Sequence, residues 1–270
     1  LIIGAGMAAD AAAKAIREVD AGANVGMVGD EAQPPYQRPP LSKALWKGDK
    51  SVADIDLATA ASGAQLHAGR HIESLDRAAH VARDDHGDTY RYRRLLLATG
   101  ATPRRLPFDG GERLIHFRTL DDYQALRRYA QPGAYIAVIG GGFIGSELAA
   151  SLSSAGCKVT MLFPGPAIGA GRYPAGLAGY LDNYYRSHDV DVRSGITVTG
   201  GGATDGGVEL ALSDGEVLRV EAVVAGLGVT PNTALAEQAG LAVDNGIVVN
   251  AQLRRSDPDK IGRASGRERG

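Results

Sequence analysis

Two glycine-rich segments have the spacing of phosphate-binding turns. Residues 4–9 read GAGMAA and residues 140–145 read GGGFIG, each directly after an apolar run. In a strand–turn–helix of this kind, the first glycine permits the tight reversal and the second lets a pyrophosphate approach the backbone, while the third position allows close helix packing. One such turn is weak evidence, but two in the same context predict two dinucleotide sites. The residues expected to cradle the phosphates are Gly4, Gly6 and Ala9, and Gly140, Gly142 and Gly145.

The segments around these turns indicate an α/β fold written as two comparable units. In the first unit we expect a helix over residues 10–19, a strand over 24–28, and antiparallel strands within the alternating residues 65–98. The other expected elements are helices at 144–155 and 177–187, strands at 158–163 and 223–228, and a hairpin of 208–212 with 217–220.

Composition and charge exclude other classes of protein. The chain has 270 residues, a formal net charge of -2 and one cysteine, Cys157, so we expect neither nucleic-acid binding nor a disulfide framework. No apolar run reaches the roughly 20 residues that span a membrane. His67 and His71 have helical i,i+4 spacing, but the alternation around them indicates strand and loop, so we expect no metal site. The single thiol fits a reducing compartment, and we expect a cytoplasmic protein.

Three strings carry a resemblance to a known family. Residues 35–43 read PYQRPPLSK, residues 97–101 read LATGA, and residues 140–147 read GGGFIGSE. In these strings the chain resembles the pyridine nucleotide-disulfide oxidoreductases, flavoproteins in which a glutathione-reductase-like FAD domain contains an inserted NAD(P) domain, both Rossmann-like. It is most similar to the branch of apoptosis-inducing factor and the ferredoxin reductases. That branch lacks the redox disulfide, and residues 36–46 here contain no cysteine.

The resemblance implies FAD in the first unit and NADH or NADPH in the second. It assigns the FAD pyrophosphate to the first glycine turn, the adenosine ribose to Asp30, and a phosphate or ribityl contact to Arg38. Asp30 also lies about 20 residues beyond the glycines, where a ribose-binding acid is expected, although a turn alone explains an acid there. The other residues expected beside the cofactors are Thr99, Gly100 and Gly228.

The same resemblance implies a catalytic group of Lys43, Glu147 and Phe143. Lys43 would lie beside the isoalloxazine ring, held by the stiff Pro39-Pro40 loop and by an ion pair with Glu147 near the flavin N5. Phe143 would cover the flavin until nicotinamide displaces it. Each residue also has a simpler explanation: a solvated loop lysine, an acid favoured by the helix dipole, and a phenylalanine in the core.

The second unit departs from the pattern of NADH sites. An acid normally ends the second strand and binds the ribose 2′-hydroxyl, but residues 161–165 read MLFPG. Arg172 follows and would suit the 2′-phosphate of NADPH, although a loop arginine is usually only solvated. The resemblance favours NADH, and the sequence allows either NADH or NADPH in the second unit.

The resemblance also sets the expected domains. Residues 1–106 and 232–260 would form the FAD domain, truncated at its C-terminal side, and residues 107–231 the NAD(P) domain. Residues 261–270, IGRASGRERG, resemble translated sequencing adapter. We therefore set them apart as a non-native tail.

The function implied is an FAD-dependent NAD(P)H oxidoreductase. Hydride would pass from nicotinamide to flavin N5 and electrons onward to ferredoxin, rubredoxin, a quinone or oxygen, with a homodimer in the intact protein. The alternative is an NADH-responsive redox sensor or nucleotide-binding protein with little turnover, as in apoptosis-inducing factor. A flavin monooxygenase is a third option, against which the proline–lysine loop argues.

Overall fold

The computed structural model describes residues 1–253 and 260–262, which divide between two compact units. Unit 1 contains residues 1–37, 53–102 and the described residues from 230 onward, and unit 2 contains residues 38–52 and 103–229. The chain passes between the units near residues 102 and 229, and residues 38–52 pack within unit 2. The assignment of FAD and NAD(P) domains stays a prediction.

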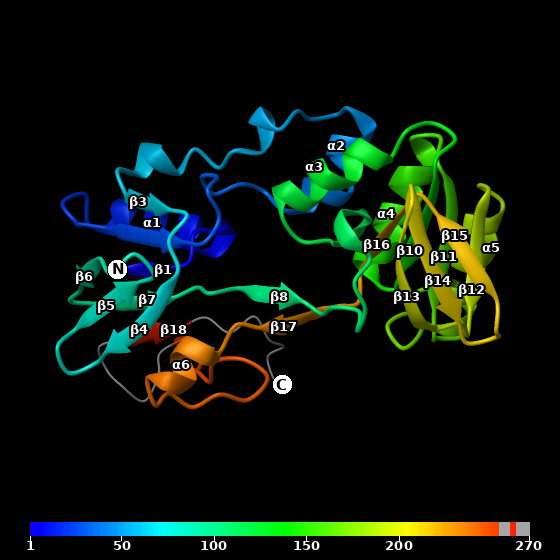
Figure 1. Ribbon diagram of the computed structural model, residues 1–270. Coiled ribbons are helices and arrows are strands. Elements are labelled where there is room, and N and C mark those ends of the chain that lie inside the picture. Colours follow the sequence, from blue (N-terminus) through cyan, green and yellow to red (C-terminus); the bar gives the residue numbers. More distant parts are fainter. Residues whose placement is uncertain (254–259, 263–270) are drawn as a thin grey trace. The chain divides into compact units, whose positions relative to one another are not determined.

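Unit 1 is built on a parallel sheet in the order β18-β7-β1-β2-β3 (Figure 1). The strands are β1 (Ile2–Ile3), β2 (Gly26–Gly29), β3 (Gln65–Ala68), β7 (Leu95–Leu97) and β18 (Lys260–Gly262). The helix α1 (Met7–Val19) connects β1 to β2 and buries Ala9 and Ala13. The backbone of β18 overlaps the first residues of the segment set apart as a tail, and residues 263–270 lie outside the described residues. That the tail is non-native stays a prediction.

The antiparallel prediction for residues 65–98 is correct in part. The strands β4 (Ile72–Asp76), β5 (Val81–Asp84) and β6 (Thr89–Arg91) form an antiparallel sheet. The strand β3 instead runs parallel to β2, so the prediction was wrong there. Its alternating exposure fits the edge of a sheet, and local alternation cannot reveal the direction of a distant partner strand.

A buried carboxylate ties the small antiparallel sheet together. Asp84, at the end of β5, is 1% exposed. It accepts hydrogen bonds from the Tyr90 hydroxyl (2.8 Å), from Arg70 Nη1 (3.2 Å) and from two backbone amides, those of His86 and Asp88. Its charge is therefore fully paired.

Unit 2 is built on a second parallel sheet in the order β12-β11-β10-β16-β9. Its strands are β9 (Leu114–His116), β10 (Tyr135–Ile139), β11 (Lys158–Phe163), β12 (Val190–Ser194) and β16 (Ala222–Ala225), and its helices are α3 (Leu120–Tyr129), α4 (Phe143–Ser154) and α5 (Ala175–Arg186). A three-stranded antiparallel layer packs against this sheet through a shared core that includes Val208, Leu210 and Val223. It consists of β13 (Val198–Thr204), β14 (Gly207–Leu212) and β15 (Val217–Val220), and contains the expected hairpin.

Short elements complete both units. The ribbon of β8 (Ala101–Pro103) and β17 (Val229–Pro231) lies where the chain leaves and re-enters unit 1, and α6 (Ala234–Gln238) packs on β4. Both units also contain short 3-10 helices, among them η2 (Ala53–Ile55), η3 (Thr59–Ser62) and η4 (Gly111–Arg113).

The segment 38–52 joins unit 2 through its apolar side chains. It forms η1 (Pro39–Ser42) and α2 (Ala44–Lys47), with Leu41, Leu45 and Trp46 buried. The Tyr123 hydroxyl of α3 donates to the Leu45 carbonyl at 3.2 Å, and the Trp46 ring meets the Tyr123 ring edge-on. Contacts to α3 and α4 therefore hold this segment within unit 2.

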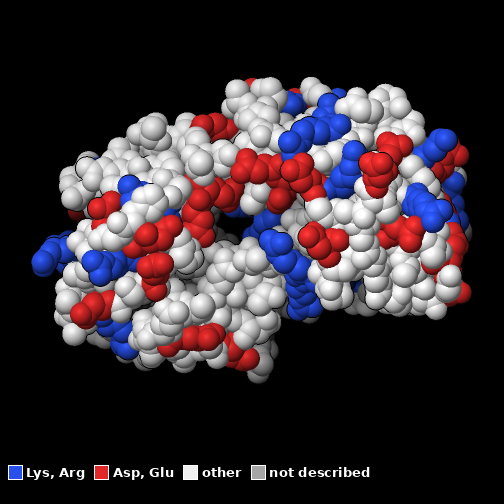
Figure 2. All heavy atoms as spheres, in the orientation of Figure 1, with Lys and Arg blue, Asp and Glu red and all other residues white. Residues whose placement is uncertain are grey.

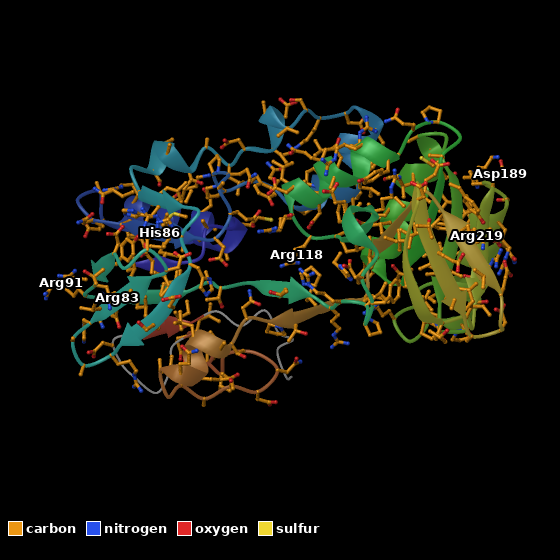
Figure 3. All side chains as sticks on the ribbon, in the orientation of Figure 1. Arg83, His86, Arg91, Arg118, Asp189 and Arg219 are labelled. Atoms are coloured by element: carbon orange, nitrogen blue, oxygen red, sulfur yellow. The ribbon has the colours of Figure 1, made fainter. Side chains whose placement is uncertain are left out.

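No helix among the described residues is long and apolar enough to cross a membrane. On the visible face of each unit, acidic and basic side chains are interspersed (Figure 2). Arg83 and Arg91, from β5 and β6, are exposed on unit 1 (Figure 3).

Candidate functional site

The glycine turn of unit 1 has the form of a phosphate cradle. Gly4 has φ +118°, and a Cβ there would overlap the carbonyl of Ala98 at the end of β7. Gly6 is the N-cap of α1, has no side-chain cap, and has open space where its Cβ would lie. Ala9 is fully buried against the sheet. The turn thus leaves the first amides of α1 accessible to an anion.

Asp30 lies directly after β2, where the sequence placed the ribose-binding acid. Its side chain is 67% exposed, and its Oδ1 lies 3.1 Å from His71 Nδ1. An exposed carboxylate at this edge can accept hydrogen bonds from sugar hydroxyls. The sequence alone marks His71 only by its spacing from His67, and its position beside Asp30 becomes clear in the structure.

Thr99 and Gly100 have a structural partner that the sequence did not reveal. The Thr99 hydroxyl donates to the Asn232 carbonyl at 2.7 Å, and the Asn232 amide donates back to the Thr99 carbonyl at 2.9 Å. The Asn232 N–H also donates to the Gly100 carbonyl. These bonds fix the end of β7 to the chain after β17, so a contact of Thr99 or Gly100 with a cofactor stays a prediction.

The glycine turn of unit 2 is more tightly packed. Gly140 has φ +124°, and its Cβ would lie 2.5 Å from the Gly226 carbonyl oxygen. A Cβ on Gly145 would overlap the Gly140 carbonyl. Gly142 is the N-cap of α4 and, like Gly6, has no side-chain cap. Both turns therefore present an uncapped helix N-terminus at the end of a central strand.

Lys43 and Glu147 form the expected ion pair. Lys43, between η1 and α2, places its Nζ 2.9 Å from Glu147 Oε2 in the first turns of α4. The Ser42 hydroxyl donates to the same carboxylate oxygen at 2.6 Å, and the Ser42 carbonyl accepts from the Ser151 hydroxyl at 2.8 Å. Ser42 is 2% exposed. Glu147 is thus oriented by two donors from one loop, and the simpler explanation of a freely solvated Lys43 does not hold.

Phe143 is exposed, and Arg172 lies over its ring. The Phe143 side chain is 55% exposed, which argues against the core-packing explanation. The Arg172 guanidinium carbon lies 5.3 Å from the centre of the Phe143 ring, and the Tyr173 ring meets Phe143 edge-on. Phe143 and Arg172 therefore form one surface beside the second glycine turn.

Arg38 and Gly228 complete the residues that the sequence singled out in unit 2. Arg38 Nη1 donates to the carbonyl of Arg118 at 3.1 Å, in the loop before α3 (Figure 3). Gly228 has φ +86°, and its carbonyl accepts from the Arg104 N–H at 3.0 Å. Neither contact excludes a role in binding, and that role stays a prediction for both.

The residues present fit nucleotide cofactors. Each uncapped helix begins at a glycine whose missing side chain leaves the amides open, and each helix has at least 12 residues. Amides at a helix N-terminus and its dipole together favour a diphosphate. No group of three or more His, Cys, Asp or Glu side chains that could hold a metal ion occurs among residues 1–253 and 260–262.

Cys157 has the environment of a packed thiol. It is buried before β11, and its Sγ lies 3.5 Å from the Gln131 carbonyl. Burial, with a smaller effect of Glu221, raises the pKa of the Cys157 thiol. A thiol with a raised pKa is a poor nucleophile at neutral pH, so dithiol chemistry is not expected here.

These features agree with comparisons to known proteins. A profile of the family described as pyridine nucleotide-disulphide oxidoreductase matches residues 1–259. The chain belongs to this family. Membership confirms the α/β class with Rossmann-like domains, and the relatives below confirm the ferredoxin reductase branch.

Two curated relatives are named as reductases. The chain is 37% identical over 263 residues to the anthranilate 1,2-dioxygenase system ferredoxin–NAD(+) reductase component of Burkholderia cepacia, covering 95% of this chain and 65% of the relative. It is 34% identical over 270 residues to putidaredoxin reductase of Pseudomonas putida, covering 96% of this chain and 64% of the relative. The chain thus spans less than two thirds of the length of these family members.

A solved structure has a similar fold. The covalent complex of putidaredoxin reductase with putidaredoxin contains a chain that matches with a TM-score of 0.90 at 33% identity, covering 97% of this chain and 66% of that one. The family fold therefore extends over nearly all of the chain.

Proposed function

We propose that this chain is the nucleotide-binding part of an FAD-dependent NAD(P)H oxidoreductase. When bound, the two cofactors supply hydride transfer from the nicotinamide to the flavin. The observation that carries the proposal is the ion pair of Lys43 and Glu147 on the helix that begins at the second glycine turn. The names of the two relatives support the same activity.

The two glycine turns would bind the diphosphates. In unit 1, the amides at the start of α1 would bind FAD, and Asp30 would accept hydrogen bonds from its adenosine ribose. In unit 2, the amides at the start of α4 would bind the nicotinamide nucleotide. The chain contributes chiefly position and charge, because the cofactors carry the redox chemistry.

Lys43 would supply a fixed positive charge. Its ammonium is held by Glu147 at 2.9 Å, and Glu147 is held in turn by the buried Ser42. A charge fixed in advance stabilises negative charge that develops nearby without reorganisation at the moment of reaction. Glu147 and Ser42 are positioning residues for Lys43 in this mechanism.

The test is the rate of flavin reduction in Lys43→Met. We expect anaerobic reduction by NADH, followed by bleaching of the flavin absorbance, to slow by about 10²-fold, the cost of losing one preorganised electrostatic contact. Lys47→Met is the matched control, because Lys47 lies one helical turn further on and is exposed. Unchanged reduction in Lys43→Met would contradict the role of the lysine, and yellow colour that persists with excess NADH and NADPH would contradict the activity.

We further propose a small redox protein, a ferredoxin or a rubredoxin, as the electron acceptor. The support comes from the two relatives, one a ferredoxin–NAD(+) reductase component and the other a putidaredoxin reductase. Turnover with several acceptors tests this, since an NADH-responsive sensor would be reduced and then cycle slowly with all of them. A cytoplasmic location is also proposed, on the single buried thiol of Cys157.

A further inference from the structure

The end of β11 in unit 2 contains no acid. Residues 163–174 read FPGPAIGAGRYP, with no aspartate or glutamate, although this stretch begins about 20 residues beyond the glycine turn, where the ribose-binding acid belongs. The neighbouring strand β12 ends at Ser194, and the next residue, Gly195, donates its N–H to the Gly165 carbonyl at 3.0 Å. These residues therefore contribute no negative charge to the edge that would face the adenosine ribose.

The loop that follows β11 folds back onto the glycine turn. Gly169 donates its N–H to the Gly141 carbonyl at 2.8 Å, and the buried Asp182 accepts from the Ile168 N–H at 2.8 Å. These bonds bring Arg172 back to the start of α4, where its Nη1 lies 3.0 Å from the Cβ position of Gly142. Arg172 thus lies at the nucleotide site rather than on a distant loop.

The Arg172 guanidinium is available to a ligand. Within the part of the chain that the structure describes, the guanidinium forms no hydrogen bond and no ion pair, and it lies over the Phe143 ring. The other arginines of this region differ: Arg193 pairs with Asp191 and Glu216, and Arg186 donates to the Val192 carbonyl. A guanidinium with free donors is suited to bidentate binding of a phosphate.

We propose that Arg172 binds the 2′-phosphate of NADP(H), so that unit 2 accepts NADPH at least as well as NADH. The missing acid removes both a partner for the 2′-hydroxyl of NADH and a charge that would repel the phosphate of NADPH. Arg172 then supplies the attraction. This inference rests on the proposed function, because it concerns the nucleotide that unit 2 binds.

The experiment is a calorimetric titration of the full chain with NADP⁺, NAD⁺, adenosine 2′,5′-bisphosphate and 5′-AMP. We expect NADP⁺ and the bisphosphate to bind at least as tightly as their counterparts without the 2′-phosphate. Arg172→Ala should weaken only the two 2′-phosphorylated probes, by about 10- to 100-fold, the effect of losing a charged hydrogen-bonding contact. Arg219→Ala, an 80% exposed arginine on β15 of the same unit (Figure 3), is the matched control.

The outcomes separate this inference from the proposed function. If NAD⁺ binds and NADP⁺ does not, the inference is overturned while the proposed function stands. Equal weakening of all four probes in Arg172→Ala would make the arginine a contact of the diphosphate or α-phosphate, and would also overturn the inference. Failure of both dinucleotides to bind would instead overturn the proposed function.

A second variant tests the same rim by adding the missing acid. A Cβ at Gly165 would meet its nearest atoms at 3.8 Å or more, so it fits there in ordinary van der Waals contact. Gly165→Glu should weaken NADP⁺ by at least 10-fold and leave NAD⁺ unchanged or tighter, whereas Gly165→Gln should change the ratio of the two much less. An unchanged ratio in Gly165→Glu would contradict the placement of the ribose at this strand end.

Discussion

The two glycine turns of this chain share their first position and differ in their third. Gly4 and Gly140 both have a positive φ, and at both a Cβ would collide with a backbone carbonyl of a neighbouring strand end. The third position is Ala9 in unit 1 and Gly145 in unit 2, where a Cβ would overlap the Gly140 carbonyl. The fingerprint positions are therefore not equivalent, because each depends on how closely its own helix approaches its own strand.

The rims of the two turns differ more than the turns themselves. In unit 1 the strand after the turn is followed by Asp30, beside His71. In unit 2 the same place is followed by an acid-free loop that carries Arg172 back to the glycines. The first glycine of the turn is thus common to both units, and the charge beside the turn differs between the two proposed sites.

The largest expected effect comes from adding a methyl group at the first glycine of either turn. Gly140→Ala places a Cβ 2.5 Å from the Gly226 carbonyl oxygen at φ +124°, so we expect unit 2 to lose about 3 kcal/mol or more. Trp46, the only tryptophan, lies in unit 2, and its fluorescence in a urea titration reports this loss.

Two further substitutions serve as controls for that effect. Gly4→Ala should destabilise unit 1, measured by circular dichroism, and shift the Trp46 transition less than Gly140→Ala does. Gly6→Ala has open space around its Cβ and should change stability by less than about 1 kcal/mol. If Gly6→Ala were as damaging as Gly140→Ala, the packing explanation of the first position would be wrong.

Substitution of Asp30, the acid beside the glycine turn of unit 1, should have a moderate effect on FAD affinity. Asp30→Asn removes the charge proposed to accept the ribose hydroxyls, and we expect FAD to bind about 10-fold more weakly, the value of one hydrogen bond to a charged group. Quenching of flavin fluorescence on binding measures this. Asp20→Asn, an exposed acid at the end of α1, should leave the affinity unchanged, and an equal loss in both variants would exclude a specific role for Asp30.

The smallest expected effect concerns the stability of the fold at low pH, to which the buried Asp84 of unit 1 contributes. Burial alone would raise the pKa of Asp84, but hydrogen bonds from Tyr90 and two backbone amides, with the charge of Arg70, hold it below its usual value. A carboxyl with a lowered pKa stabilises the fold above its unfolded pKa, and this contribution is lost as the pH falls through the folded pKa.

Asp84→Asn should therefore be less stable than the parent at pH 7, and the difference should shrink towards pH 3. Thermal unfolding followed by circular dichroism at several pH values measures it, with the exposed Asp76→Asn as the control. A constant difference from pH 7 to pH 3 would show that the Asp84 charge is not the cause.

Elements with strong local signals could be predicted from the sequence. The strand 158–163 has the predicted bounds, the hairpin of β14 and β15 was found, and the helix after the second glycine turn begins one residue earlier than expected. The ion pair of Lys43 with Glu147 was predicted too, but only through the family resemblance. The helix at 120–129 was missed, although the capping box of Thr119 with Asp122 marks its start.

Features that depend on distant contacts could not be predicted. The parallel pairing of β3, the packing of residues 38–52 within unit 2 and the bond of Thr99 to Asn232 each join segments far apart in the chain. Ser42 was overlooked for the same reason, because its role depends on the carboxylate of Glu147. No local pattern marks a serine that orients an acid more than 100 residues away.

The contact of Ser42 with Glu147 also has a consequence for folding during synthesis. The two residues are 105 positions apart, so on the ribosome the loop of Lys43 emerges well before the helix that holds it. Until α3 and α4 have been made, Leu41, Leu45 and Trp46 cannot pack against them. The entropic cost of closing such a loop rises slowly with its length, by about 0.6 kcal/mol for each doubling. A fragment made of residues 103–229 alone would lack Lys43, the ion-pair partner of Glu147.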